Sequence, residues 1–186
     1  MIDYTPVTSG QRKIADLAAD ITLDDLKATT NEQIDTLVTL LRDLSDAQVV
    51  FVASDPAAEG GVGWNVAHLI AHVTASSEEN AAVSSILARG IDLPFEPRLR
   101  AETEWTTLTT TAGCIQRLEE SRRMRQGYLS AWPDQPVLDT HRTLPSGFAE
   151  MVGPMNALAA ALLGLVHEAG QLTQLRQIIA QAQAAA

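Results

Sequence analysis

The sequence has one cysteine, few aromatic residues and no long uninterrupted apolar run, and each shortage excludes a class of protein. A single thiol, Cys114, cannot form an internal disulfide, which suits a reducing environment. Phe, Trp and Tyr make up 4% of the chain, which argues against the aromatic platforms that stack nucleic-acid bases. The most apolar stretch, residues 155–166, is interrupted and too short to span a bilayer.

Basic residues are also scarce, because 13 Lys and Arg face 23 Asp and Glu and leave a formal charge of −10. A surface this acidic repels phosphate backbones and anionic membranes. We therefore expect neither a nucleic-acid nor a membrane partner. The N-terminus lacks a basic start followed by an apolar core and a small-residue cleavage site. We therefore expect a cytoplasmic protein.

The hydrophobic pattern that remains is helical. Apolar residues at helical spacing predict four long helices over residues 23–44, 64–88, 110–131 and 154–182. Thr22 before an acidic turn predicts the first helix start, and Pro154 predicts the last. Only residues 49–52 suggest a short extended piece. We expect one all-α domain over residues 1–186, with an N-terminal extension at 1–21 and a four-helix bundle at about 22–183 joined by long inter-helix loops.

Polar side chains interrupt the apolar faces of two of these helices. His68 and His72 lie one turn apart on the second helix, at the edge of its apolar stripe. On the last helix, His167 and Gln171 share a stripe with large aliphatic residues. Because buried polar groups are costly without partners, these side chains require an explanation.

Three interpretations are open. The groups could hydrogen-bond one another inside an inert bundle, or they could line a metal-free pocket for a small polar ligand. Alternatively, His72 and His167 bind a divalent metal, with Gln171 one turn beyond His167. A neutral amide is a weaker ligand for zinc or nickel than imidazole or carboxylate.

A family resemblance favours the metal. Trp64-Asn65-Val66 followed by His72, and His167 followed by Gly-Gln-Leu at 170–172, resemble the DinB-like (YfiT-like) metalloenzyme superfamily. The resemblance covers residues 23–182 and implies a four-helix bundle of up-down-down-up order that forms a homodimer. It also implies a metal site made of a histidine eight residues after the tryptophan and a His-x-x-x-His or Glu-x-x-x-His pair on the last helix. His72 and His167 match two ligands, Gln171 stands where the third is expected, and His68 is a substitute.

The resemblance further implies a transferase or isomerase that uses a low-molecular-weight thiol such as mycothiol or bacillithiol on a small-molecule substrate. A zinc or nickel ion would favour deprotonation of that thiol. Glu79 is the candidate general base, and Glu78 is expected to be an exposed charge. Arg125 is the candidate for holding a cofactor or ligand carboxylate, with outward snorkelling or a pair with Glu79 as alternatives.

A second function belongs to a different class. The chain would then be a non-catalytic DinB-like bundle with a degenerate metal site, acting as a small-molecule-binding or dimerisation module.

Overall fold

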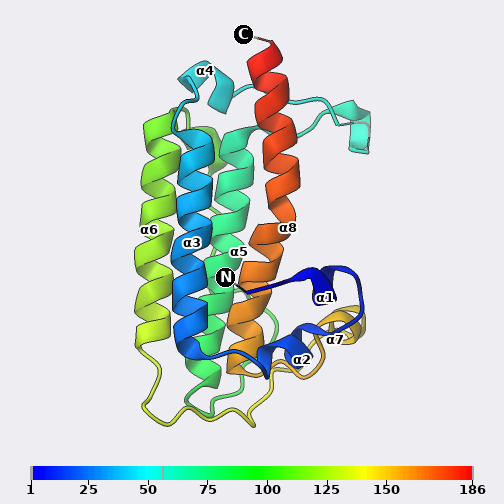
Figure 1. The fold of residues 1–186 in the computed structure, drawn as a ribbon, viewed down its shortest axis with the longest axis vertical. Helices are drawn as coiled ribbons and strands as arrows, with labels where there is room; N and C mark the ends of the chain where they lie inside the picture. The colour runs from blue at the N-terminus through cyan, green and yellow to red at the C-terminus, as the bar shows by residue number, and fades with distance from the viewer. Residues whose placement is uncertain (1, 56, 186) are drawn as a thin grey trace.

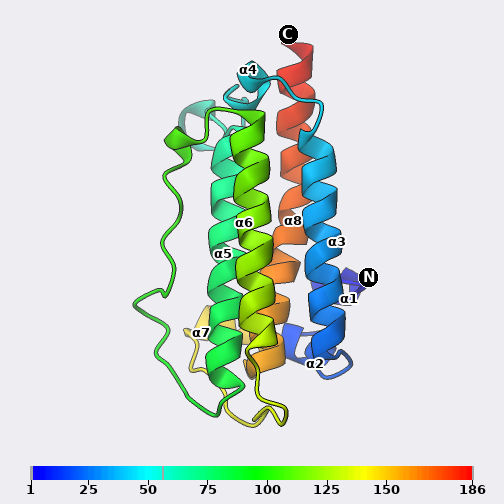
Figure 2. The same ribbon diagram turned by 90° about the vertical axis from the view of Figure 1, so that its left-hand side faces the viewer.

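Four long helices run along the long axis of the molecule (Figure 1). They are α3 (Leu23–Leu41), α5 (Val66–Leu87), α6 (Thr111–Ser130) and α8 (Ala157–Ala184) in a computed structural model that describes residues 2–55 and 57–185. Both α5 and α3 pack against α6 and against α8. Helices α3 and α8 run in one direction and α5 and α6 in the other (Figures 1 and 2), so the predicted up-down-down-up bundle is confirmed.

Polar side chains cap each long helix at its start. Thr22, Asn65, Thr110 and Asn156 accept hydrogen bonds from the backbone N–H three residues further on. Such caps satisfy donors that have no partner within the helix. The predicted start of the last helix at Pro154 is wrong by three residues, because Asn156 supplies this cap and Pro154 lies in the turn before it.

The N-terminal segment packs on the bundle. It forms α1 (Thr5–Thr8) and α2 (Ile14–Ala18). The side chains of Ile14 and Leu17 are buried in the same apolar cluster as Leu162 of α8. The segment predicted to be an extension therefore contributes to the core at one end of the bundle. A second cluster fills the other end, with Leu37, Leu69, Leu118 and Ile178 among its members.

The connections contain short helices that the periodicity did not indicate. Helix α4 (Asp46–Val49) and a 3₁₀ turn, η1 (Glu59–Gly61), lie between α3 and α5, and α7 (Ser146–Val152) precedes α8. The extended piece predicted at residues 49–52 is wrong, because Ser45 caps a helical turn that includes Val49. None of the helices in the described part of the chain is both long and apolar enough to cross a membrane.

The connection from α5 to α6 covers one side of the bundle. After α5 the chain climbs back along the outside of that helix before α6 begins (Figure 2). Near its end a 3₁₀ turn, η2 (Trp105–Thr107), contacts α5. This segment therefore brings side chains from the middle of the sequence against the helix that carries His68 and His72.

Helices α5 and α8 approach closely at Gly164. A Cβ atom on this residue would lie 3.1 Å from the Asn80 Cβ and 3.2 Å from the Ser77 Cα. Because the backbone of α5 cannot yield easily, we expect Gly164→Ala to lower the free energy of unfolding by about 1–3 kcal/mol in urea denaturation. Gly170→Ala on the same helix meets no atom within 4 Å. This control should raise stability by up to about 1 kcal/mol through helix propensity. Equal stability changes in the two variants would contradict a tight α5–α8 crossing.

Candidate functional site

Two imidazoles meet where α5 and α8 pack together. The Nε2 atoms of His72 and His167 are 3.2 Å apart, although 95 positions separate the residues in the chain. The rings stand edge to face, with an interplanar angle of 68°. Two Nε2 atoms this close must share a proton in a hydrogen bond or direct their lone pairs at one cation.

Glu102, from the connection between α5 and α6, lies behind His72. Its Oε2 atom is 3.5 Å from the His72 Nδ1 atom, and its Oε1 atom is 3.8 Å from the His68 Nε2 atom. A carboxylate on the Nδ1 side favours a proton there. The lone pair of His72 then lies on Nε2, the atom that faces His167.

His68 is held between two tryptophan rings. It stacks on Trp64 at a centroid distance of 4.1 Å and on Trp105 at 4.9 Å. Trp64 also meets His72 edge-on. The observed side-chain contacts of His68 are thus with two aromatic rings and Glu102, next to the histidine pair.

Burial lowers the pKa of His167, and the neighbouring His72 imidazole and Arg98 guanidinium act in the same direction. Burial also lowers the pKa of His68, against the opposing effect of Glu102. A lowered imidazole pKa keeps the ring neutral at neutral pH, which is the form that binds metals. His167 Nδ1 is buried without a hydrogen-bond partner among the described residues. No described residue on the Nδ1 side therefore determines which ring nitrogen of His167 carries the proton.

The remaining donors of the predicted metal site are weak. Gln171 lies one turn after His167 on α8 and is half-buried. Among residues 2–55 and 57–185, no group of three or more His, Cys, Asp and Glu side chains could hold a metal ion. The imidazoles of His72 and His167 therefore fit two ligand positions of a divalent metal. Gln171 occupies the sequence position at which the resemblance implies a third ligand.

A cavity of about 760 Å³ opens beside His167. Glu79 lies in its wall and is 5% exposed, and its Oε2 atom accepts a hydrogen bond of 2.7 Å from the backbone N–H of Arg100. The structure thus brings Glu79 and His167 to one cavity. Its volume is within the range of small-molecule sites.

Arg125 lies elsewhere, in the interior of the bundle. Its Nη1 atom donates to Glu168 Oε2 at 3.1 Å, and both side chains are almost fully buried. Ser77 donates to the same carboxylate oxygen. Of the alternatives considered for Arg125, outward snorkelling is wrong because the side chain is buried. The pair with Glu79 is also wrong, because Glu168 on α8 reaches the guanidinium from within the core.

The expectation that Glu78 is an exposed charge is also wrong. This side chain is fully buried and forms ion pairs with Arg100 and Arg117. Arg117 comes from α6 and Arg100 from the connection that covers α5, so both partners are distant in sequence. Two guanidinium groups offset the cost of burying the carboxylate.

Sequence patterns gave no sign of Glu102 or Glu168 as partners of the site. Glu102 lies in a segment without periodicity, so nothing in the sequence indicates which helix it meets. Glu168 directly follows His167, and its burial was detectable only as a charged residue within an apolar stretch. Long-range packing places both carboxylates.

Comparison with known proteins gives one family match. The family model of the DinB superfamily matches residues 16–175, from within α2 to within α8. The matched range includes the His72–His167 pair, Glu102 and the buried Arg125–Glu168 pair. Comparisons with curated proteins and with solved structures gave no match.

Proposed function

The chain belongs to the DinB superfamily, and from this premise we propose that it is a divalent-metal-dependent enzyme that joins a low-molecular-weight thiol to a small molecule. The observation that carries the proposal is the pair of facing imidazole nitrogens, 3.2 Å apart. The family match supports the bundle, and the histidine pair supports the metal site within it.

The separation of the two nitrogens suits a shared metal ion. Two imidazoles bound to one tetrahedral metal at 2.0–2.1 Å place their nitrogens about 3.3 Å apart. His72 and His167 would hold the ion, with the Gln171 amide oxygen as a weak third ligand. Glu102 would orient His72 from the Nδ1 side, as carboxylates behind metal-bound histidines commonly do.

A divalent metal in this position would act as a Lewis acid and lower the pKa of a bound thiol. Residues of the chain would supply the remaining functions of the site. Glu79, in the wall of the cavity next to His167, would accept a proton from the reacting molecule. Trp64, His68 and Trp105 form a stack next to Glu102 and would hold the His68 ring in a fixed orientation beside the site.

The proposal is tested with chelator-treated protein that carries no histidine tag. We expect it to bind one equivalent of zinc or nickel per chain in calorimetry. The metal-loaded protein should then accelerate the loss of thiol from mycothiol or bacillithiol with 1-chloro-2,4-dinitrobenzene as the electrophile. Stoichiometric metal without any thiol consumption would exclude the thiol chemistry, and failure to bind either metal would exclude the metalloenzyme.

A second function is favoured by the scarcity of strong ligands. The described part of the chain offers no three-residue group of His, Cys, Asp and Glu for a metal. In this alternative the chain is a non-catalytic bundle, and a proton shared between the Nε2 atoms of His72 and His167 takes the place of the ion. The metal titration separates the two functions.

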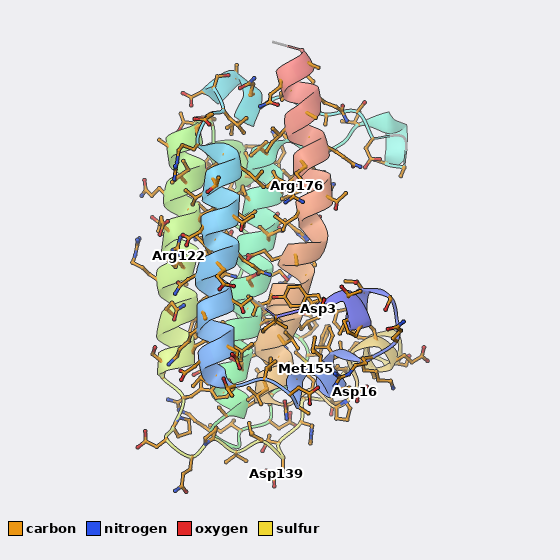
Figure 3. All side chains as sticks on the ribbon, in the orientation of Figure 1. Asp3, Asp16, Arg122, Asp139, Met155 and Arg176 are labelled. Atoms are coloured by element: carbon orange, nitrogen blue, oxygen red, sulfur yellow. The ribbon has the colours of Figure 1, made fainter. Side chains whose placement is uncertain are left out.

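Glu102→Gln tests the orienting carboxylate. We expect its affinity for zinc to fall about tenfold, because a neutral amide holds the Nδ1 proton of His72 less strongly. The measurement is competition with a coloured chelator. Asp139→Asn is the control, since Asp139 is an exposed carboxylate in the connection between α6 and α7 (Figure 3) and should leave zinc affinity unchanged. An unchanged affinity in Glu102→Gln would leave Glu102 without this role.

A further inference from the structure

We propose that the cavity beside His167 binds a small molecule with an apolar body and a single carboxylate, and that Arg98 is the residue that receives the carboxylate. This inference deepens the proposed function by naming its substrate class. The cavity itself does not depend on a metal ion.

Most of the cavity wall is apolar. Side chains from α1, α2, α7, α8 and the connection after α5 contribute, including Val7, Ile14, Phe95, Phe148, Met151 and Leu163. The Phe95 and Phe148 rings lie 5.8 Å apart. Phe148 and Met151 are 38% and 49% exposed. An apolar ligand body would cover this surface and gain burial free energy.

Four charged side chains lie in the same wall, and two of them have hydrogen-bond partners within the chain. Arg142 donates to the carbonyl oxygens of Pro94 and Phe95 and lies over the Phe95 ring. Glu79 accepts from the backbone of Arg100. Glu96 is an exposed carboxylate at the edge of the cavity.

Arg98 is the fourth and is the positively charged member of the wall that remains available to a ligand. It is exposed, as Glu96 is, and its guanidinium forms no hydrogen bond or ion pair with another residue in the described part of the chain. It lines the cavity together with His167. A guanidinium is well suited to a carboxylate, which it can bind through two parallel hydrogen bonds.

The balance of charge favours a monoanion over a dianion. Two arginines, Arg98 and Arg142, share the wall with two carboxylates, Glu79 and Glu96. A dianionic phosphate would face both carboxylates with one uncommitted guanidinium to offset them. These four charges cancel, so a single carboxylate at Arg98 leaves one net negative charge and a dianion leaves two. The apolar body of the ligand can lie against Phe95 and Phe148.

The test uses 4-phenylbutyrate and its neutral amide as probes, with chelator-treated protein and binding measured by calorimetry or by NMR shifts. We expect the acid to bind more tightly than the amide to wild type. Arg98→Gln should weaken binding of the acid by about fivefold or more and leave the amide unchanged. Arg123→Gln is the matched control, because Arg123 is exposed on α6, a helix that contributes no residue to the cavity wall.

Equal binding of acid and amide by wild type, or an acid affinity that Arg98→Gln does not change, would overturn the inference. Circular dichroism of each variant shows that the fold is retained. Because the probes are measured without metal, binding of the acid by a protein that takes up no zinc or nickel would refute the metalloenzyme and leave this inference standing. Zinc uptake without any preference for the acid would support the metal site and overturn this inference.

Discussion

Zinc affinity should fall by at least about 100-fold when His72 is replaced by alanine, because removing a metal ligand costs more than the 10- to 100-fold typical of groups behind it. His167→Ala should have the same effect, since the two Nε2 atoms face each other across 3.2 Å. Competition with a chelator of known affinity measures the change. This is the largest effect that we expect on function, and thiol consumption should disappear with the metal.

His141→Ala is the control for this pair of variants, because His141 is exposed and lies in the connection between α6 and α7. It should bind zinc as wild type does. If His72 and His167 only share a proton, both alanine variants will lower stability and none of the three proteins will differ in zinc uptake. Zinc binding that survives in His72→Ala would assign any observed metal to another part of the chain.

Removing either member of the buried Arg125–Glu168 pair should destabilise the fold by about 3–5 kcal/mol, the usual cost of leaving one charge buried alone. Both side chains are 2% exposed or less and lie between α6 and α8. Arg125→Met and Glu168→Leu are the single variants, measured by urea denaturation. The double variant should be more stable than either single one, because it leaves neither charge behind. A double variant that loses the sum of both single effects would contradict the pairing.

The pH dependence of stability offers a second readout for Glu168. Burial raises the pKa of this carboxyl, against the opposing effects of Arg125 and of the hydrogen bond from Ser77. A carboxyl with a higher pKa in the folded state favours folding below its ordinary value of 4.5 and loses that contribution as pH rises toward the folded pKa. Wild type should therefore lose stability relative to Glu168→Gln as pH rises above 4.5.

The predicted family resemblance is confirmed over residues 16–175, and the predicted all-α architecture is confirmed as well. Zinc or nickel, the thiol, the homodimer and the cytoplasmic location stay predictions. So do the roles of Glu79, Arg125, His68 and Gln171, although the structure gives each of them a definite position.

What the sequence by itself determined is local in origin. A helix is predicted from apolar residues spaced three or four positions apart and from a capping residue at its start. Both signals come from residues close together in the chain, such as Thr22 and Asp25. The bounds of α3, α5 and α6 follow from these short-range rules to within a few residues. The pairing of His72 with His167 came from a motif resemblance, because periodicity shows which face a histidine occupies and leaves its partner undetermined.

Only the tertiary structure decided which carboxylates and guanidiniums lie near that histidine pair. Glu102 and Arg98 lie in a connection without periodicity, and the path of that connection along α5 brings one to His72 and the other to the cavity. Glu78 and Glu168 resemble surface charges in sequence, yet each is buried against an arginine from another element. An opposite charge from a distant segment offsets the cost of burying each of these two carboxylates, and chain packing decides which segments meet.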